Sequence, residues 1–374
     1  MTKFIDRELT SKIKKDFFKG KVIILVGPRQ VGKTTLIKSI LTDKNVVEFV
    51  GDNPTDRVKL ENRDFEQLNT LIGNKQFIFI DEAQKIKNIG QTLKLLVDNL
   101  KSNQQIIATG SSSLNILSNT QEALTGRKFI YELFGFSLRE IFPEMNPLTI
   151  EKNLSNMLIF GSYPEVFLNS GDHRQRILTD ITGSYLYKDI LELEQIKNPA
   201  SLNKLLIAIA LQIGSKVSLT ELSATVGLDI KTVERYIDLL EKNYVLLRLS
   251  PYYTNQRKTL SKQNKIFFYD LGVRNALINN FNPLEQRGDI GGLWENFLIL
   301  ERLKYRQVMR INATQYFWRT YDGAEIDLIE QRQGKLYGYE FKWARERTTP
   351  QSWLSYPNSE YKLINKHNFI SFLK

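Results

Sequence analysis

The chain has 374 residues, of which 42% are hydrophobic and 25% are charged, a composition typical of a globular protein with more than one domain. The absence of cysteine excludes disulfides and cysteine-bound zinc, and two histidines, His173 and His367, are too few and too far apart for a histidine-built metal site. No apolar run is long enough to span a membrane, and the charged N-terminus lacks the apolar core of a signal peptide. We therefore expect a cytoplasmic protein without membrane contact.

The net charge of +11 is unevenly distributed along the chain. Residues 1–150 contain 22 basic and 17 acidic residues, residues 151–250 contain 11 and 12, and residues 251–374 contain 19 and 12. A basic excess suits a polyanionic partner such as DNA, although a basic protein without such a partner has the same composition. The charge alone leaves both interpretations open.

Strands and helices are expected to alternate through the first 148 residues. Short apolar runs predict strands at residues 21–26, 46–50, 77–80, 105–109 and 129–133, and helical spacing predicts helices at residues 33–41 and 91–101. Such alternation is typical of βαβ units around a parallel sheet. We expect an α/β domain over residues 1–148, with its boundary in the loop between Pro143 and Pro147.

The loop after the first strand has the pattern of a phosphate-binding loop. GPRQVGKTT fits G-x-x-x-x-G-K-[ST], with a strand before it and a helix after it. Lys33 is expected to bind the β and γ phosphates, and the hydroxyl of Thr34 is expected to hold Mg²⁺. The residues expected to surround the nucleotide are Gly27, Pro28, Arg29, Gln30, Val31, Gly32, Lys33, Thr34 and Thr35.

The third strand ends in acidic residues. In FIFIDEAQ, Asp81 emerges at the carboxyl end of a buried strand, where ligands bind in open α/β sheets. Asp81 is expected to assist Mg²⁺ coordination, and Glu82 is expected to polarise the attacking water. The two motifs together predict a nucleoside triphosphatase, but the loop residues do not distinguish ATP from GTP.

GPRQVGKTTL, FIDEAQ, ATGSSS and LTGR together resemble the bacterial and archaeal AAA+-type ATPase family whose C-terminal half is a DUF4143 domain. The resemblance implies ATP as the nucleotide. It implies a polar sensor at Thr109 or Ser111, with Ser111 preferred, although a turn-forming loop fits these residues nearly as well. It also places an arginine finger at Arg127, for which a surface salt bridge is the alternative. A finger acting in trans requires a homo-oligomer. We expect this oligomer to be a ring, and a hexamer is one candidate for its size.

Residues 149–255 are expected to be mainly helical and to contain a winged helix-turn-helix. Its helices are expected at residues 219–225 and 230–241, followed by a wing-like strand at 244–249. Three of the five outward residues of the second helix are acidic, which disfavours base reading in a DNA groove. These five are Asp229, Lys231, Glu234, Arg235 and Asp238. Packing, or contact with the phosphate backbone, is the favoured interpretation.

Residues 256–374 are expected to form a second α/β domain. A helix at 294–305 and strands at 315–319, 326–330 and 336–343 bring Glu295, Asp327, Glu340 and Lys342 to one polar face. This arrangement resembles the PD-(D/E)xK nucleases, and the DUF4143 resemblance implies a restriction-endonuclease-like fold. Carboxylates and a lysine in this pattern can hold Mg²⁺ and orient a nucleophile. The alternatives are a domain that only binds, or an exposed polar strand face without a site.

These observations predict an ATP-binding and ATP-hydrolysing protein that acts on DNA by loading, translocation or remodelling. A nucleotide-dependent regulatory switch or scaffold without motor activity is the second hypothesis. An ATP-gated, Mg²⁺-dependent DNA nuclease is the third.

Overall fold

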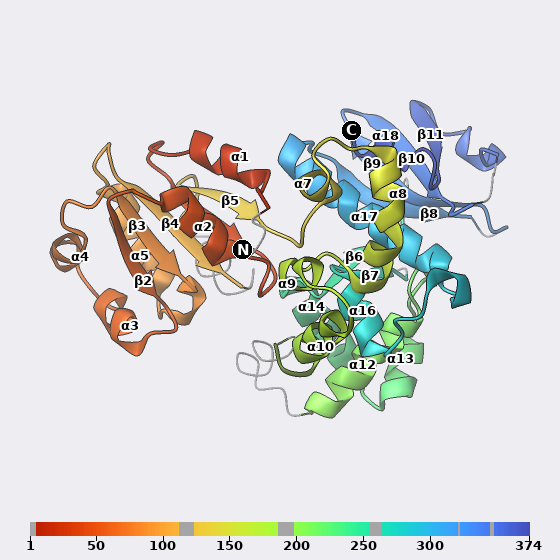
Figure 1. The fold of residues 1–374 in the computed structure, drawn as a ribbon, viewed down its shortest axis with the longest axis horizontal. Coiled ribbons are helices and arrows are strands. Elements are labelled where there is room, and N and C mark those ends of the chain that lie inside the picture. The colour runs from red at the N-terminus through yellow and green to blue at the C-terminus, as the bar shows by residue number, and fades with distance from the viewer. Residues whose placement is uncertain (1–4, 112–122, 186–197, 254–262, 321, 345–347) are drawn as a thin grey trace. The chain divides into compact units, whose positions relative to one another are not determined.

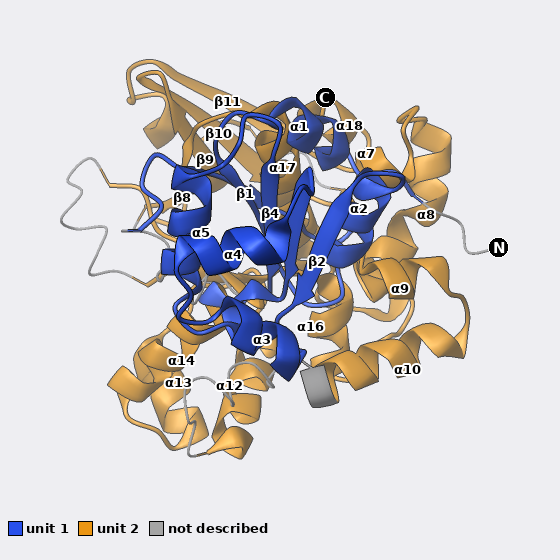
Figure 2. Ribbon diagram, turned by 90° about the vertical axis from the view of Figure 1, so that its left-hand side faces the viewer, with its two compact units in different colours: residues 1–136, 242–244 blue, residues 137–241, 245–374 orange. Residues whose placement is uncertain are grey.

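The computed structural model describes residues 5–111, 123–185, 198–253, 263–320, 322–344 and 348–374 (Figure 1). The chain divides into two compact units, coloured separately in Figure 2. The first unit comprises residues 1–136 and 242–244, and the second comprises residues 137–241 and 245–374.

The first unit is built on a five-stranded sheet with the order β2-β3-β4-β1-β5, in which every neighbouring pair is parallel. The strands are β1 (Val22–Val26), β2 (Val46–Val50), β3 (Phe77–Asp81), β4 (Gln105–Gly110) and β5 (Lys128–Glu132). Every residue of the central strands β1, β3 and β4 is buried, as expected for parallel strands covered on both faces. All carboxyl ends of these strands lie at one edge of the sheet because the strands run in the same direction.

Short amphipathic helices connect these strands. Among the described residues they are α1 (Leu9–Lys15), α2 (Lys33–Leu41), α3 (Pro54–Leu60), α4 (Phe65–Ile72), the 3-10 turn η1 (Ala83–Lys85) and α5 (Ile89–Asp98). Helix α2 buries Leu36, Ile37 and Ile40 and packs against β4, and α4 lies beside α5 (Figure 2). The side chain of Asp64 caps α4 by accepting the backbone N–H of Gln67.

The second unit begins with a mainly helical region. Its described helices before the last sheet are α7 (Leu138–Ile141), α8 (Pro147–Phe160), α9 (Pro164–Leu168), α10 (Asp172–Asp180), the π-helix η2 (Ile181–Tyr185), α12 (Pro199–Leu211), α13 (Leu219–Val226), α14 (Ile230–Lys242), α16 (Leu271–Leu277) and the 3-10 turn η3 (Leu284–Gln286). Ser218 caps the start of α13, and Gly227 ends this helix with a left-handed conformation. Strands β6 (Leu246–Leu249) and β7 (Lys265–Phe268) form an antiparallel pair.

The C-terminal part of the second unit is a four-stranded sheet with the order β11-β10-β9-β8. The strands are β8 (Thr314–Arg319), β9 (Glu325–Arg332), β10 (Lys335–Phe341) and β11 (Ser359–Ile364), and the remaining helices are α17 (Ile290–Met309), the 3-10 turn η4 (Gln351–Trp353) and α18 (Phe369–Phe372). Strands β8, β9 and β10 are antiparallel neighbours, whereas β11 pairs parallel to β10. The long helix α17 packs against β10 and α8 (Figure 1), and its buried Trp294 and Phe297 join the core of this unit.

The expected parallel sheet and its five strands are confirmed, and the ends of these strands differ by at most one residue from the expected ones. The helix-turn-helix pair α13 and α14 also forms where it was expected. Helix α17 begins at Ile290 rather than Trp294, and strand β11 was not expected. The winged-helix and restriction-endonuclease-like assignments stay predictions. Among the described residues, no helix is long and apolar enough to cross a membrane.

Candidate functional site

The candidate site of the first unit lies at the carboxyl edge of its parallel sheet. The loop of residues 27–32 follows β1, Asp81 ends β3, and Ser111 follows β4. These three strands are neighbours in the sheet, so their carboxyl ends are adjacent. The architecture therefore brings together the residues that the two sequence motifs single out.

The phosphate-binding loop has the backbone that its glycines permit. Gly27 and Gly32 have φ angles of 147° and 90°, which other residues rarely adopt. A Cβ atom at Gly27 would lie 2.0 Å from the carbonyl oxygen of Leu133, so a larger residue would displace the chain after β5. Gly32 forms the N-cap of α2, and the helix begins at Lys33. Its first backbone N–H groups therefore lie beside the loop, where anions bind.

Lys33 is buried and turned back onto its own loop. Its Nζ atom donates hydrogen bonds to the carbonyl oxygens of Gly27, at 3.0 Å, and Pro28, at 2.7 Å. These oxygens hold the ammonium group over the loop. The remaining loop residues surround this arrangement: Val31 is buried, Arg29 is half-buried, and Gln30 and Thr35 are exposed.

Thr34 and Asp81 meet across the edge of the sheet. The Thr34 hydroxyl lies 2.9 and 3.0 Å from the two carboxylate oxygens of Asp81. The hydroxyl of Thr109 in β4 donates a short hydrogen bond to the same carboxylate and accepts the backbone N–H of Glu82 at 3.3 Å. Thr109 is fully buried in β4. Its two hydrogen bonds hold Asp81 and Glu82 in place at the end of β3.

Glu82 is connected to the end of β4 through Gln84. The amide nitrogen of Gln84 donates to the Glu82 carboxylate at 2.5 Å and to the Ser111 hydroxyl at 2.8 Å. Glu82 itself has a left-handed backbone conformation, with φ of 49°, which sets the direction of its side chain. The buried amide oxygen of Gln84 has no hydrogen-bond partner among the described residues. Gln84 is the last residue of FIFIDEAQ, but the motif alone did not predict a role for it.

Arg7, which lies in the N-terminal segment, holds the phosphate-binding loop in place. Its guanidinium group is buried and donates to the carbonyl oxygens of Val31, at 3.0 Å, and Phe134, at 2.6 Å. The same group lies 5.0 Å from the ring centre of Phe136. Arg7 thereby connects the phosphate-binding loop to the chain that follows β5, which no sequence motif indicated.

These residues fit a magnesium nucleotide. Mg²⁺ binds through one or two carboxylates together with substrate phosphates, and it prefers oxygen ligands. Thr34 and Asp81 provide two adjacent oxygen donors, and no further acidic ligand is required. Lys33 and the N-terminal N–H groups of α2 provide the positive charge and the donors that a triphosphate needs.

Arg127 lies at the other end of the sheet. It precedes Lys128, which pairs with Val22 at the amino end of β1, whereas the phosphate-binding loop follows the carboxyl end of β1. Its Nε atom forms an ion pair with Asp98 at 2.5 Å, and the side chains of Arg127 and Asp98 are 42% and 38% exposed. The structure therefore does not bring Arg127 to the phosphate-binding loop of its own chain.

In the second unit, the structure brings together all four residues of the expected nuclease-like set. The amino group of Lys342 lies 3.2 Å from Glu340 and 3.8 Å from Asp327. Asp327 also accepts the backbone N–H of Phe341 at 2.8 Å, and Glu340 accepts the hydroxyl of Tyr361 at 2.8 Å. Glu295 is buried beside Asp327, and Glu340 is also buried, whereas the side chain of Lys342 is 30% exposed. The expected polar face therefore exists and is mostly buried.

A fifth residue, Lys265, occupies the centre of this cluster. Its Nζ atom lies 2.7 Å from Glu295, 2.7 Å from Glu325 and 3.3 Å from Asp327. Burial opposes the charge on Lys265, but the three carboxylates outweigh it and raise its pKa above the ordinary value. Burial also raises the pKa of Glu295, with Lys265 opposing that shift. Among the described residues, no group of three or more acidic or histidine side chains is placed to hold a metal ion.

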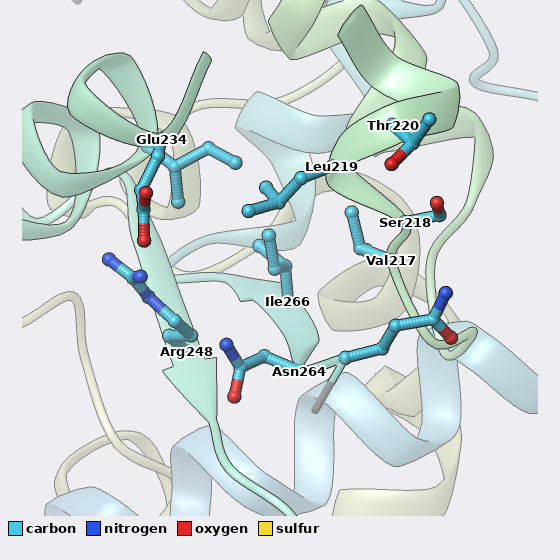
Figure 3. A pocket seen from close by; sticks show the side chains of 10 residues that line it. Val217, Ser218, Leu219, Thr220, Glu234, Arg248, Asn264 and Ile266 are labelled. Atoms are coloured by element: carbon cyan, nitrogen blue, oxygen red, sulfur yellow. The ribbon is translucent and has the colours of Figure 1, made fainter. Parts of the chain in front are cut away.

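A pocket of about 270 Å³ with both polar and apolar lining residues lies at the helix-turn-helix (Figure 3). Leu219 of α13 and Ile266 of β7 form part of its apolar wall, and Glu234 and Arg248 face each other across one side. Arg248 forms ion pairs with Asp238 and Glu241, so its positive charge is already balanced. Among the described residues that line the pocket, the one cation is therefore already paired.

Of the five residues that were expected to face outward from α14, four are exposed and Asp238 is half-buried. The exposed four are Asp229, Lys231, Glu234 and Arg235. Asp229 also caps the helix, because it accepts the backbone N–H and the hydroxyl of Thr232 at 2.9 and 2.6 Å. This exposed face is not basic, in line with the disfavoured base reading.

Three segments of the chain match models of known protein families. Residues 19–142 match the family model of an AAA domain. Residues 151–284 match a domain of unknown function, DUF8612, and residues 290–366 match another, DUF4143. The AAA match covers the whole candidate nucleotide site, and the DUF4143 match covers Glu295, Asp327, Glu340 and Lys342.

The chain also resembles whole proteins at low identity. An uncharacterized protein of Mycobacterium tuberculosis is 28% identical over 340 residues, which cover 90% of this chain and 73% of the relative. An uncharacterized protein of Haemophilus influenzae is 22% identical over 342 residues, which cover 86% of this chain and 81% of the relative.

Among solved structures, the Walker-type ATPase of Pyrococcus abyssi has a TM-score of 0.47 at 15% identity and covers 74% of this chain and 96% of its own. A STAND-type signal transduction ATPase of Pyrococcus horikoshii has a TM-score of 0.30 at 12% identity, with 83% and 48% covered.

The AAA match and the geometry of the loop, Asp81 and Glu82 agree with each other. The match to DUF4143 confirms that part of the expected resemblance, whereas its nuclease-like nature stays a prediction. The chain thus carries an AAA domain with a P-loop, followed by two domains of unknown function.

Proposed function

We propose that the chain hydrolyses ATP and uses the hydrolysis to act on DNA. The observation that carries the ATPase proposal is the meeting of Lys33, Thr34, Asp81 and Glu82 at one edge of a parallel sheet, inside a domain that matches the AAA model. Each of these residues has the chemical group that phosphoryl transfer to water requires.

In the proposed reaction, Lys33 exchanges the carbonyl oxygens of Gly27 and Pro28 for the β and γ phosphates of ATP. Thr34 and Asp81 hold Mg²⁺, which neutralises phosphate charge when it is bound. Glu82 orients a water molecule and accepts its proton as the water oxygen bonds to the γ phosphorus. The bond from that phosphorus to the bridging oxygen breaks, and ADP leaves. Gln84 holds the Glu82 carboxylate in place, and Ser111 is the proposed sensor of the γ phosphate.

The proposal that the partner is DNA rests on charge. Residues 251–374 contain 19 basic and 12 acidic residues, and a basic surface is attracted to a phosphate backbone. The exposed residues that were expected to face outward from α14 are two acids, Asp229 and Glu234, and two bases, Lys231 and Arg235, so we propose contact with phosphates rather than base reading. Stimulation by DNA should therefore weaken as the salt concentration rises.

The first experiment measures ATP turnover by the whole chain alone and with duplex, single-stranded or branched DNA. We expect one DNA form to stimulate turnover, and we expect Glu82→Gln to lower the rate by about 10²-fold or more, because it removes the general base. Binding of a fluorescent ATP analogue should be kept in this variant. Glu66→Gln, which changes an exposed acid in α4, is the matched control and should leave the rate unchanged.

The outcomes separate the parts of the proposal. Turnover that persists in Glu82→Gln would contradict the role of this site in hydrolysis. A slow rate that no DNA form changes would contradict the DNA proposal and favour the nucleotide-dependent switch, whose partner would then be a protein.

A further inference from the structure

Lys265 is a buried cation at the centre of the C-terminal cluster. It projects from β7, its side chain is 2% exposed, and its ammonium group lies 5.6 Å from the ring centre of Phe317. Its carboxylate partners come from two other elements: Glu295 from α17, and Glu325 and Asp327 from β9. The cluster therefore joins three elements that are separate in the sequence.

Lys265 is additional to the lysine of the nuclease-like pattern. That lysine is Lys342, which follows β10 and contacts Glu340 and the second carboxylate oxygen of Asp327. Lys265 instead takes the first oxygen of Asp327 and one oxygen of Glu295. It enters from outside the four-stranded sheet, because β7 pairs with β6.

The residues present do not fit a bound magnesium ion. Mg²⁺ requires oxygen ligands at about 2.0–2.1 Å in octahedral geometry. The carboxylate oxygens of Glu295 and Asp327 that face the centre of the cluster are occupied by an ammonium group at 2.7 and 3.3 Å. A divalent ion among the same oxygens would lie within a few ångströms of a positive charge, where the repulsion is strong.

The lysine also explains how so many acids can be buried together. Buried carboxylates are tolerated only when they are paired and hydrogen-bonded. Glu295, Asp327 and Glu325 are each within ion-pair distance of Lys265. A single internal ammonium group thus makes the contacts with these carboxylates that a metal ion would otherwise make.

We infer that Lys265 stands in the place of a divalent cation, so that the C-terminal domain binds no catalytic metal and does not cut DNA. The cluster is a structural clamp that holds β7 against α17 and β9. This inference concerns a different part of the chain from the ATP site and does not depend on ATP hydrolysis.

The test counts bound Mn²⁺ by electron paramagnetic resonance, in the absence of nucleotide, with the whole chain. Wild type and Asp327→Asn should bind the same number of ions, because the wild-type cluster holds none. The asparagine keeps an oxygen for the N–H of Phe341, so this variant is designed to fold. The comparison also cancels any ion bound near Asp81.

The second arm removes the lysine. Lys265→Ala should bind one Mn²⁺ more than wild type, and the gain should disappear in Lys265→Ala combined with Asp327→Asn. Lys335→Ala is the matched control, since it removes an exposed lysine of the same domain, and it should gain no ion.

Either arm can overturn the inference. An ion bound by wild type and lost in Asp327→Asn would contradict it directly, as would Mn²⁺-dependent DNA cutting that Asp327→Asn abolishes. A folded Lys265→Ala protein that binds no additional ion would show that the lysine does not replace a cation. If Lys265→Ala does not fold, the comparison of wild type with Asp327→Asn still shows whether the wild-type cluster binds a metal ion.

Discussion

Gln84 is a short polar side chain that joins two parts of the candidate ATP site. Its amide nitrogen contacts both Glu82 and Ser111, which leave the ends of neighbouring strands. Gln84 thus connects the carboxylate that is proposed to orient water with Ser111, the proposed sensor of the γ phosphate. A displacement of about 1 Å in such a group can lower a rate by roughly 10²-fold.

We predict that Gln84→Ala lowers kcat for ATP at least about 10-fold while the affinity for a fluorescent ATP analogue changes less than about 3-fold. The affinity should be kept because Gln84 contacts neither the phosphate-binding loop nor Thr34. Gln84→Glu has the same shape but cannot donate to Glu82, and it should lose kcat as well. A kcat unchanged in both variants would show that the contact with Glu82 has no part in turnover.

The sequence predicted the residues of the ATP site that belong to contiguous motifs. Lys33, Thr34, Asp81 and Glu82 each follow a strand at a fixed spacing, so local pattern was sufficient. Arg7 and Lys265 were not predicted, because their partners lie far away in the sequence. Arg7 contacts Phe134, and Lys265 contacts Asp327. No spacing rule indicates such contacts before the fold is known.

At the scale of elements, buried strands and regular helices could be predicted from the sequence. The edge strand β11 and the first residue of α17 could not be predicted. β1 and β3 are continuous apolar runs, whereas β11 alternates half-buried and exposed residues at the edge of its sheet, a pattern that also suits a loop. The start of α17 was expected too late because Gly291 and Gly292 disfavour helices. Asp289, which is held by Arg274 and Arg287, instead fixes the start of the helix from tertiary structure.

Helix α17 is tied to the C-terminal sheet by a buried ion pair. Arg302 donates two parallel hydrogen bonds to Glu330 of β9, at 2.9 and 2.8 Å, and a third to the carbonyl oxygen of Phe372 in α18 at 2.7 Å. The side chains of Arg302 and Glu330 are 7% and 0% exposed. Removing one member would leave a charge buried with fewer partners.

We predict that Arg302→Ala lowers the free energy of unfolding of the second unit by about 3–5 kcal/mol. The measurement is urea unfolding followed by tryptophan fluorescence, which reports this unit because Trp294, Trp318, Trp343 and Trp353 all lie in it. Lys335→Ala breaks the exposed ion pair with Glu360 and should leave the transition almost unchanged. Equal effects of the two substitutions would contradict the importance of the buried pair.

At the scale of the whole molecule, the chain has two compact units but matches three family models. The expected division at residues 148 and 255 stays a prediction. The expectation of assembly also belongs to this scale, because Arg127 lies at the opposite end of the sheet from its own phosphate-binding loop. Any role as a finger therefore requires a second copy of the chain.

We predict that Arg127→Ala lowers ATP turnover, whereas Asp98→Ala, which breaks the same ion pair from the other side, does not. An equal loss in both variants would indicate a structural salt bridge. Mixing Arg127→Ala with Lys33→Ala should restore part of the activity, because a mixed oligomer can pair an intact loop with an intact arginine. Absence of restoration, with both proteins forming oligomers, would contradict a finger in trans.

The hydrogen bonds that Lys33 makes to its own loop mean that Lys33→Ala changes the loop as well as the contact with ATP. The lysine braces its loop through the carbonyl oxygens of Gly27 and Pro28. Replacing it removes an internal brace as well as a ligand contact. Part of any lost affinity in Lys33→Ala would then come from a loop that has relaxed before ATP arrives, and a lower melting temperature of the nucleotide-free protein would reveal that share.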